Sequence, residues 1–267
     1  MKKNLTFYIC TFLSLLLIAV TFNQRSTPTV NKEIWAPPSG YATQWQWQLK
    51  SMPSYISGIT IYDFDGEDAA ASDVKNLKDR GARTICYISA GSWEDWRSDA
   101  SSFPSSVKGK KLDGWAGEKW LDIRQLSILL PIMGKRMDVC KAKGFDAVEA
   151  DNVDGYANNT GFPLTSNDQL VYNKVLAQLA HDRGMSIALK NDVDQLETLE
   201  PYFDFAINEE CFAYNECGKY KPFVDAGKAV LNVEYKKTSV RCSRAKSLGI
   251  SSMMKKLELD EWRKPCK

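Results

Sequence analysis

Histidine is almost absent from this sequence of 267 residues, because His181 is the only one. It lies in LAHDRG, within an expected helix, where a histidine more often packs or faces solvent than binds a ligand. Ser-His-Asp and Cys-His catalysis are therefore nearly excluded, since both need a histidine beside the nucleophile. Cys-x-x-Cys spacing and glycine-rich phosphate turns are also missing, which argues against a zinc cluster and against phosphate-binding loops.

Charge of one sign is not concentrated anywhere in the chain. There are 35 Lys and Arg against 33 Asp and Glu, interleaved along the whole length, for a formal net charge of +2. No basic face predicts nucleic acid as a partner, and no acidic tail predicts disorder. With 44% hydrophobic residues, the length is typical of one large globular domain.

The longest uncharged run, LTFYICTFLSLLLIAVTF at residues 5–22, follows two lysines. This pattern predicts a signal peptide over residues 1–24. Because the run is long and no clear cleavage site follows, an uncleaved membrane anchor is the alternative. Residues 25–34 are expected to form a linker, and residues 35–267 a folded domain that is secreted or anchored only through this N-terminal segment.

Six further cysteines follow Cys10 of this segment, and an even number in an exported chain is typical of disulfides. The short spacing predicts a Cys211–Cys217 bridge across a local loop, and a Cys242–Cys266 bridge would tie the last helix to the C-terminal tail. Cys86 lies in the expected strand TICYIS, where a free buried thiol is the simpler interpretation. The pairing of Cys86 and Cys140 stays open.

Five segments repeat one pattern, in which an amphipathic helical stretch ends at a glycine and a short apolar run follows. Helix then strand, repeated, predicts a parallel sheet. The segments are LKDRGARTICYIS, CKAKGFDAVEA, AHDRGMSIALK, VDAGKAVLNVE and AKSLGISSMMK. Further strands at residues 43–48, 60–64 and 203–208 raise the total to eight, which predicts a single-domain α/β fold, the (β/α)8 TIM barrel. An open doubly wound sheet is the alternative, but it normally carries the missing glycine-rich turn.

Active sites of such barrels lie at the C-terminal ends of the strands. The residues there are mostly acidic, and those that continue directly from apolar strands would stay unpaired unless used. The candidate site residues are Asp63, Asp65, Trp93, Glu149, Asp151, Asn152, Asp154, Tyr156, Lys190, Asn191, Glu209, Glu210, Glu234 and Tyr235. The segment DFDG at residues 63–66 begins like a calcium loop, but the later ligand spacing is missing, so no metal is expected.

Two carboxyl groups that face each other, one protonated and one ionised, are the equipment for cleaving a glycosidic bond. Seven of the eight tryptophans lie in the first half of the chain. Aromatic rings in open loops suit the apolar faces of sugars, although tryptophans are as often core residues. The composition of the rim therefore favours a glycoside hydrolase that needs no cofactor.

Five blocks in order make this more specific: ICYISAGSWEDWR, DGWAGEKWLDIR, FDAVEADNVDGY, INEECFAYNEC and VLNVEY. Together they resemble glycoside hydrolase family 114, the endo-α-1,4-polygalactosaminidase family, from about Trp35 to the C-terminus. The resemblance implies a secreted (β/α)8 barrel that cleaves α-1,4-linked galactosamine polymers internally. By the same resemblance, the Asp of the DN-x-D-G-Y block falls on Asp151 and the Glu of the NE-x-C block on Glu209, as the catalytic pair. Ala150 stands where proline is common in the family, which alters the stiffness of a loop.

A galactosamine unit carries an ammonium group at neutral pH, so spare carboxylates on the rim are expected to bind it. Glu209 is assigned the acid/base role and Asp151 that of nucleophile, or of base if the enzyme inverts. Two alternatives stay open. One is a hydrolase of another polysaccharide, because fold and carboxylates do not choose the sugar. The other is a non-catalytic carbohydrate-binding barrel, which the loss of one of the two carboxylates would have favoured.

Overall fold

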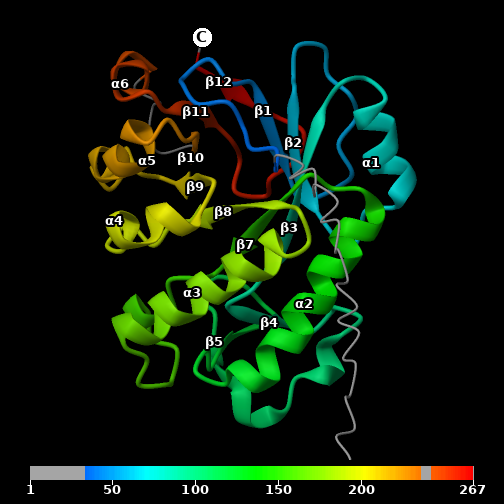
Figure 1. The fold of residues 1–267 in the computed structure, drawn as a ribbon, viewed down its shortest axis with the longest axis vertical. Coiled ribbons are helices and arrows are strands. Elements are labelled where there is room, and N and C mark those ends of the chain that lie inside the picture. The colour runs from blue at the N-terminus through cyan, green and yellow to red at the C-terminus, as the bar shows by residue number, and fades with distance from the viewer. Residues whose placement is uncertain (1–33, 236–241, 267) are drawn as a thin grey trace, which may run out of the picture. The chain divides into compact units, whose positions relative to one another are not determined.

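In the computed structural model, which describes residues 34–235 and 242–266, eight strands follow one another in space in chain order (Figure 1). Each pairs in parallel with the next. They are β1 (Trp45–Gln48), β2 (Ile61–Asp65), β3 (Arg83–Ser89), β7 (Ala147–Asp151), β8 (Ser186–Lys190), β9 (Phe205–Glu209), β10 (Val230–Glu234) and β11 (Ser251–Met254). A short strand, β12 (Lys264–Pro265), pairs antiparallel with β11. All eight expected strands are confirmed, and their order never reverses, as a doubly wound sheet would require.

The predicted signal peptide or anchor at residues 1–24 lies outside the described residues, as does nearly all of the predicted linker at residues 25–34. Within the described part of the chain, no helix is both long enough and apolar enough to cross a bilayer. The folded domain is a single unit.

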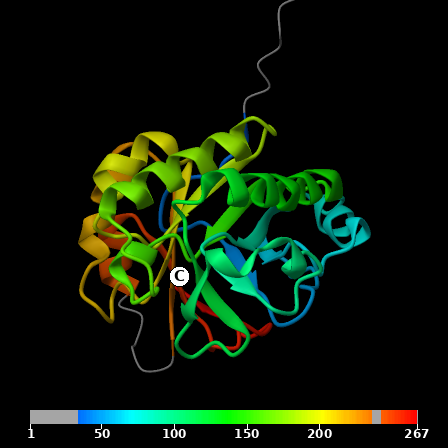
Figure 2. The same cartoon turned by 90° about the horizontal axis from the view of Figure 1, so that it is seen from below.

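Helices cover the outer face of the sheet, and from α1 to α5 each one packs against the next (Figures 1 and 2). The helices are α1 (Ala71–Lys78), α2 (Leu126–Lys143), α3 (Ser166–His181), α4 (Leu196–Leu199), α5 (Lys221–Asp225) and α6 (Cys242–Leu248). Single 3-10 turns lie at Ala100–Ser102, Ser105–Val107, Gly155–Ala157, Glu200–Tyr202 and Cys217–Tyr220. Gly144 ends α2 with a φ of 94°, the left-handed conformation that the repeated glycine predicts.

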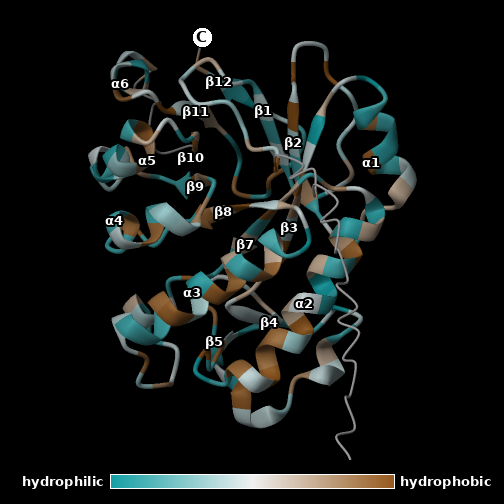
Figure 3. Ribbon diagram, in the orientation of Figure 1, coloured by the Kyte–Doolittle hydropathy of each residue, from teal (hydrophilic) through white to brown (hydrophobic). Residues whose placement is uncertain are grey.

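Alternate residues of each strand face opposite sides of the sheet. One set, drawn from all eight strands, meets in a single buried cluster inside the curled sheet. Its strand members are Trp45, Trp47, Ile61, Ile85, Ala147, Ala188, Phe205, Ile207, Leu231, Val233 and Met253. The other set, including Phe64, Val148 and Ile187, packs in a second cluster with residues of α1, α2 and α3. Figure 3 shows hydrophobic stretches on α2 and α3 interrupted by hydrophilic ones, as expected of helices with one buried side.

A small antiparallel sheet between β3 and α2 was not predicted from the sequence. Its strands are β4 (Ser92–Glu94), β5 (Lys108–Lys111) and β6 (Glu118–Leu121), in the order β4-β6-β5. Gly91 joins this sheet to the barrel, because its backbone lies so close to Asn152 that a Cβ would come within 1.6 Å of the Asn152 carbonyl oxygen. Only glycine fits there. The small sheet thereby borders the C-terminal end of β7.

Three disulfides join the six cysteines of the domain. Cys211–Cys217 and Cys242–Cys266 are paired as predicted, whereas the free thiol expected at Cys86 is wrong, since Cys86 is bonded to Cys140. The reason is the strand's alternation: Cys86 faces outward from β3, toward α2, and the two Cα atoms lie 6.0 Å apart.

The bridge between β3 and α2 should stabilise the protein more than the local one, because it spans 54 residues of sequence and the Cys211–Cys217 bridge spans 6. Loop-closure entropy gives about 4 kcal/mol for the former and about 2 kcal/mol for the latter. We expect the Cys86→Ala/Cys140→Ala double variant to lose more unfolding free energy in urea than Cys211→Ala/Cys217→Ala. Non-reducing peptide mapping of the wild type should recover all three pairs, and a free Cys86 thiol would contradict the assignment.

Candidate active site

A cavity of about 660 Å³ lies at the C-terminal ends of the strands. Its walls come from the small sheet and from the loops after β7 and β9. Eight of the predicted site residues line it: Asp151, Asn152, Asp154, Lys190, Asn191, Glu209, Glu210 and Tyr235. The volume is in the range of pockets that enclose small-molecule ligands. The rim positions predicted from the sequence therefore converge on one cavity.

At the floor of the cavity, the ammonium of Lys190 contacts three carboxylates. Its Nζ lies 2.8 Å from Glu149 Oε1, 3.0 Å from Asp151 Oδ1 and 3.3 Å from Glu209 Oε2. The Lys190 side chain is only 1% exposed, and its Nζ lies 4.5 Å from the centre of the Trp47 ring. Burial alone would lower the pKa of Lys190, but the surrounding carboxylates outweigh it and raise that pKa well above its usual value.

Asp151 is the last residue of β7, and three donors hold its carboxylate. The Tyr87 hydroxyl donates to Oδ2 at 2.9 Å, and Oδ1 accepts from the Asn152 backbone N–H at 2.8 Å and from Lys190. Burial, followed by the charge of Asp151, raises the pKa of Tyr87 well above its usual value, so this hydroxyl stays a donor. The Asp151 carboxylate is thus fixed in orientation while its side chain stays 17% exposed to the cavity.

Glu209 is the last residue of β9 and has a similar set of partners. The Tyr235 hydroxyl donates to Oε1, and Oε2 faces Lys190. The side-chain oxygen of Asn191 accepts the Glu209 backbone N–H at 3.0 Å, which fixes the end of the strand. The Glu209 side chain is 27% exposed, so it is the more open of the two predicted catalytic carboxyls.

Asp63 and Glu149 lie deeper, and both side chains are completely buried. Burial, and then the charge of Glu149, raises the pKa of Asp63 well above its usual value. No donor reaches either Asp63 oxygen or Glu149 Oε2. A proton shared between the two carboxyls accounts for both observations, so Asp63 is the neutral partner and Glu149 faces Lys190. This pair supports the floor from below and does not reach the cavity.

The chain turns sharply after the strands that carry these residues. Asn152, Asn191, Asp192 and Glu210 all have positive φ, between 46° and 62°, and each follows the end of β7, β8 or β9. Non-glycine residues rarely adopt this conformation, and where they do they often mark functional sites. The turns end each strand abruptly, so that its last side chain points into the cavity.

A second acidic group lies beside the pair. Burial, followed by the charge of Asp151, raises the pKa of Asp154 to about 6. Burial, followed by the charge of Asp154, raises the pKa of Asp192 to about 8. Tyr156 lies next to Asp192, and burial, with the charge of that carboxyl second, raises its pKa to about 12. Of these three residues, Asp154 alone is among the cavity lining.

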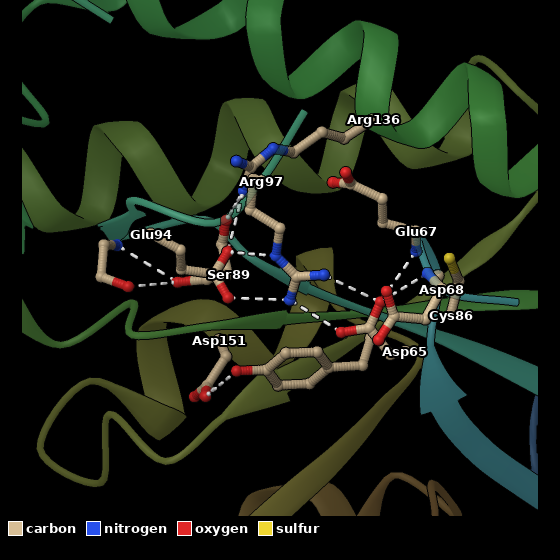
Figure 4. Close-up of polar contacts among 12 residues, drawn as sticks. Asp65, Glu67, Asp68, Cys86, Ser89, Glu94, Arg97, Arg136 and Asp151 are labelled. Carbon is tan, nitrogen blue, oxygen red and sulfur yellow. Dashed lines mark hydrogen bonds and ion pairs between the residues drawn. The ribbon is translucent and has the colours of Figure 1, made fainter. Parts of the chain in front are cut away.

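Besides Asp63, Glu149 and Tyr156, three more predicted site residues do not line the cavity. Asp65 is held by Arg97, which lies between Asp65 and Glu94 (Figure 4), with Arg97 Nη1 2.9 Å from Asp65 Oδ1. Glu234 is fully buried on the outward face of β10, where it accepts the Phe212 backbone N–H at 2.9 Å. Trp93 donates its indole N–H to the Ala100 carbonyl. Each of these side chains is used in holding a loop.

Six residues that line the cavity were not among the site residues predicted from the sequence: Tyr87, Trp47, Trp115, Trp120, Glu118 and Tyr214. Tyr87 lies two residues after Ile85 in β3 and so shares its inward face, which the period of two would have predicted. Burial raises the pKa of Glu118 to about 7, even though the Ser92 hydroxyl donates to it at 2.6 Å. Glu118 belongs to the unpredicted small sheet, and no strand signal pointed to it.

Potential metal ligands come together at one place in the part of the chain that the structure describes. Cys211, Cys217 and Glu234 are the group of potential ligands that come together there. The two sulfurs are bonded to each other, so they have no thiolate to offer a metal.

Known proteins resemble this chain in sequence and in structure. The model of glycoside hydrolase family GH114 matches residues 24–267. The crystal structure of Aspergillus fumigatus Ega3 in complex with galactosamine is 37% identical, with a TM-score of 0.80, over 87% of this chain and 97% of that one. The glycoside hydrolase domain of PelA from Pseudomonas aeruginosa shares the fold at 13% identity, with a TM-score of 0.65, over 83% and 97% of the two chains.

A search of curated protein sequences found no match. The family match covers nearly the whole chain, and the structural match to Ega3 covers nearly all of that protein. On this evidence the chain belongs to glycoside hydrolase family 114 and is a polysaccharide-cleaving glycosidase.

Proposed function

We propose that this glycosidase is a secreted, endo-acting enzyme that cleaves α-1,4-linked galactosamine polymers, with Asp151 and Glu209 as its catalytic pair. One observation carries the proposal: the carboxylates of Asp151 and Glu209 lie on the floor of the same cavity and contact the same Lys190 ammonium. Hydrolysis of a glycosidic bond needs two carboxyl groups on either side of one sugar linkage. The bound sugar in the Ega3 structure is galactosamine, which supports the choice of polymer.

The roles of the pair follow from their surroundings. Asp151 accepts hydrogen bonds from Tyr87, Asn152 and Lys190, and donors of this kind favour the ionised carboxylate. We assign it the attack on the anomeric carbon, or the activation of water if the reaction inverts. Glu209 is more exposed and has the acid/base role, which protonates the leaving oxygen. No metal or cofactor takes part in this scheme.

The cavity also suits a cationic, extended substrate. Carboxyl groups of Asp113, Glu118 and Asp154 line it beside the pair, and they attract the ammonium groups of galactosamine units. Trp115 is 49% exposed and Tyr214 is 69% exposed, and both line the cavity, from the β5–β6 turn and from the loop after β9. Exposed aromatic rings on two walls offer faces for sugars on either side of the cleaved bond, which supports endo-cleavage.

A second candidate substrate is a polymer with N-acetylated units. Lys110 and Lys111 line the same cavity on β5, and their ammonium groups repel an unmodified galactosamine nearby. A neutral N-acetylated unit avoids this repulsion. The two candidates differ only in acetylation, so one assay distinguishes them.

Export is part of the proposal and has two supports. Three disulfides are typical of proteins that fold in an oxidising compartment, and the N-terminal lysines and apolar run resemble an export signal.

Incubation of the purified protein with de-acetylated and N-acetylated α-1,4-galactosamine polymers tests the substrate. We expect the de-acetylated polymer to yield oligosaccharides of several sizes early in the reaction, because an endo-acting enzyme cuts within the chain. Mass spectrometry of the products over time provides the measurement. Release of monosaccharide alone would reject endo-action, and cleavage of the N-acetylated polymer only would select the second candidate.

Asp151→Asn and Glu209→Gln keep the side-chain shape and remove the ionisable group. Each should lower kcat by about 10²-fold or more while the melting temperature stays near that of the wild type. Glu149→Gln and Glu210→Gln are neighbouring variants that we expect to cost less. If Glu210→Gln abolishes cleavage and Glu209→Gln does not, the acid/base role belongs to Glu210; the same comparison on β7 decides between Asp151 and Glu149.

The affinity for de-acetylated polymer should fall as the pH drops through about 6, because Asp154 then takes up a proton and no longer attracts ammonium. Binding is best measured in Glu209→Gln, since both carboxylates raise the pKa of Asp154 but Asp151 raises it more than Glu209 does. Asp154→Asn should abolish the change near pH 6 and leave the change near pH 7 that Glu118 contributes, and the exposed Asp194→Asn should leave both intact. Affinity should also weaken with added salt, and equal affinity for the N-acetylated polymer would contradict the charge matching.

A further inference from the structure

Lys190 was expected from the sequence to bind substrate, but its position in the structure fits another role. It ends β8 between β7 and β9, the strands that end in Asp151 and Glu209. Its ammonium is within 3.3 Å of carboxylate oxygens from both strands, and its stem is covered by the barrel interior. The charge of Lys190 is therefore occupied by three carboxylates before any sugar enters.

We propose that Lys190 is the positioning residue of this glycosidase, whose ammonium sets the separation of the Asp151 and Glu209 carboxylates and the pH range in which the pair works. The inference rests on the proposed function in one respect, the identity of the pair. It does not depend on which sugar polymer is cleaved.

The first argument is electrostatic. Glu149, Asp151 and Glu209 bring three like charges to one small volume of low dielectric, where an unpaired carboxylate is strongly disfavoured. A cation among them offsets their mutual repulsion, so that the three can lie close together. No other cation contacts these three oxygens among the ion pairs of the described residues.

The second argument is geometric. The Lys190 stem rises from the middle strand of three, and the Trp47 ring lies against its Nζ, so the ammonium has little freedom to move. A carboxylate that bonds to a fixed ammonium is itself fixed. Asp151 and Glu209 are each held at a second oxygen by a tyrosine hydroxyl, from Tyr87 and Tyr235 respectively. Two-point contacts of this kind define both the place and the plane of each carboxylate.

Titratable groups face Lys190 from every strand around it, and each bears on the pH dependence. Glu149, Asp151 and Glu209 are the direct contacts, and Asp63 lies below them, with its charge removed by the proton it shares with Glu149. The remaining groups are the phenols of Tyr87 and Tyr235 and the carboxyl of Asp154. Lys190 is thus the positive charge of an otherwise neutral or anionic group of side chains. Removal of the Lys190 charge should therefore raise the pKa of every other titratable side chain in the group.

The test compares Lys190→Met, which keeps the length and apolar stem, with Lys190→Arg, which keeps the charge. For Lys190→Met we expect kcat to fall about 10²-fold with little change in KM, because the pair is misplaced rather than the substrate. Both limbs of its pH–rate profile should move to higher pH by about one unit or more, since the nearby positive charge is lost. For Lys190→Arg, kcat falls because the bulkier guanidinium displaces the pair, but the limbs should stay at the wild-type pH.

Lys255→Met is the matched control, because Lys255 is also fully buried and bonds to the Gln46 side chain and the Asp260 carbonyl. It should lower the melting temperature without moving either limb of the profile. Unshifted limbs in Lys190→Met, or shifted limbs in Lys190→Arg, would overturn the positioning role. If Lys190→Met does not fold, the Lys190→Arg profile alone decides.

One measurement separates this inference from the choice of substrate. NMR titration of ¹³C-labelled Asp and Glu side chains follows the carboxyls without any polymer, and the site signals should titrate at higher pH in Lys190→Met than in the wild type. A shift there together with no cleavage of any galactosamine polymer would reject the proposed substrate and keep the positioning role. Cleavage of a galactosamine polymer without this shift would support the proposed substrate and reject the positioning role.

Discussion

The compensation of buried carboxylates by one buried ammonium is the constraint on which this site depends. Lys190 and Glu149 are each at most 1% exposed, so the Glu149 charge needs the Lys190 ammonium, and that ammonium needs the carboxylates around it. The barrel supplies the geometry for this pairing, since parallel strands in register bring the ends of β7, β8 and β9 next to one another. The proposed catalytic pair, Asp151 and Glu209, lies at these strand ends, in contact with both the buried Lys190 and the cavity. Fold and chemistry therefore share the same few strand ends.

Much of the fold was predictable because its signals are local. A helix that ends at glycine before a short apolar run marks five of the eight strands, and all eight expected strands are confirmed. The small sheet β4-β6-β5 was not predicted because its strands are only three or four residues long, and one of them, Lys108–Lys111, has no apolar side chain. Backbone hydrogen bonds to Gly91 and Thr160, outside the small sheet, help to hold it. Local propensity carries no information about such contacts.

The site was predictable in part, and the predictions that were wrong have physical causes. Asp63 and Asp65 alternate with the outward Phe64 and so share the inner face of β2, yet Arg97, 32 residues further on, captures Asp65. A partner so distant leaves no trace in the local pattern. Glu234 was placed on the rim by its order in the chain, although the period of two assigns it to the outward face of β10 beside Asn232. The bond between Cys86 and Cys140 likewise depends on which helix covers β3.

The alternation of strand residues also bears on how this family can diversify. Insertion of a single residue within β7 would exchange the inward and outward sets beyond it, so that Ala150 and not Asp151 would face Lys190. Single-residue insertions in the strands are therefore not tolerated. The small sheet and the loops that carry Trp115 and Tyr214 can gain or lose residues without disturbing that register. New polymer preferences are expected to arise in these peripheral segments, because changes there leave the strand-end carboxylates in place.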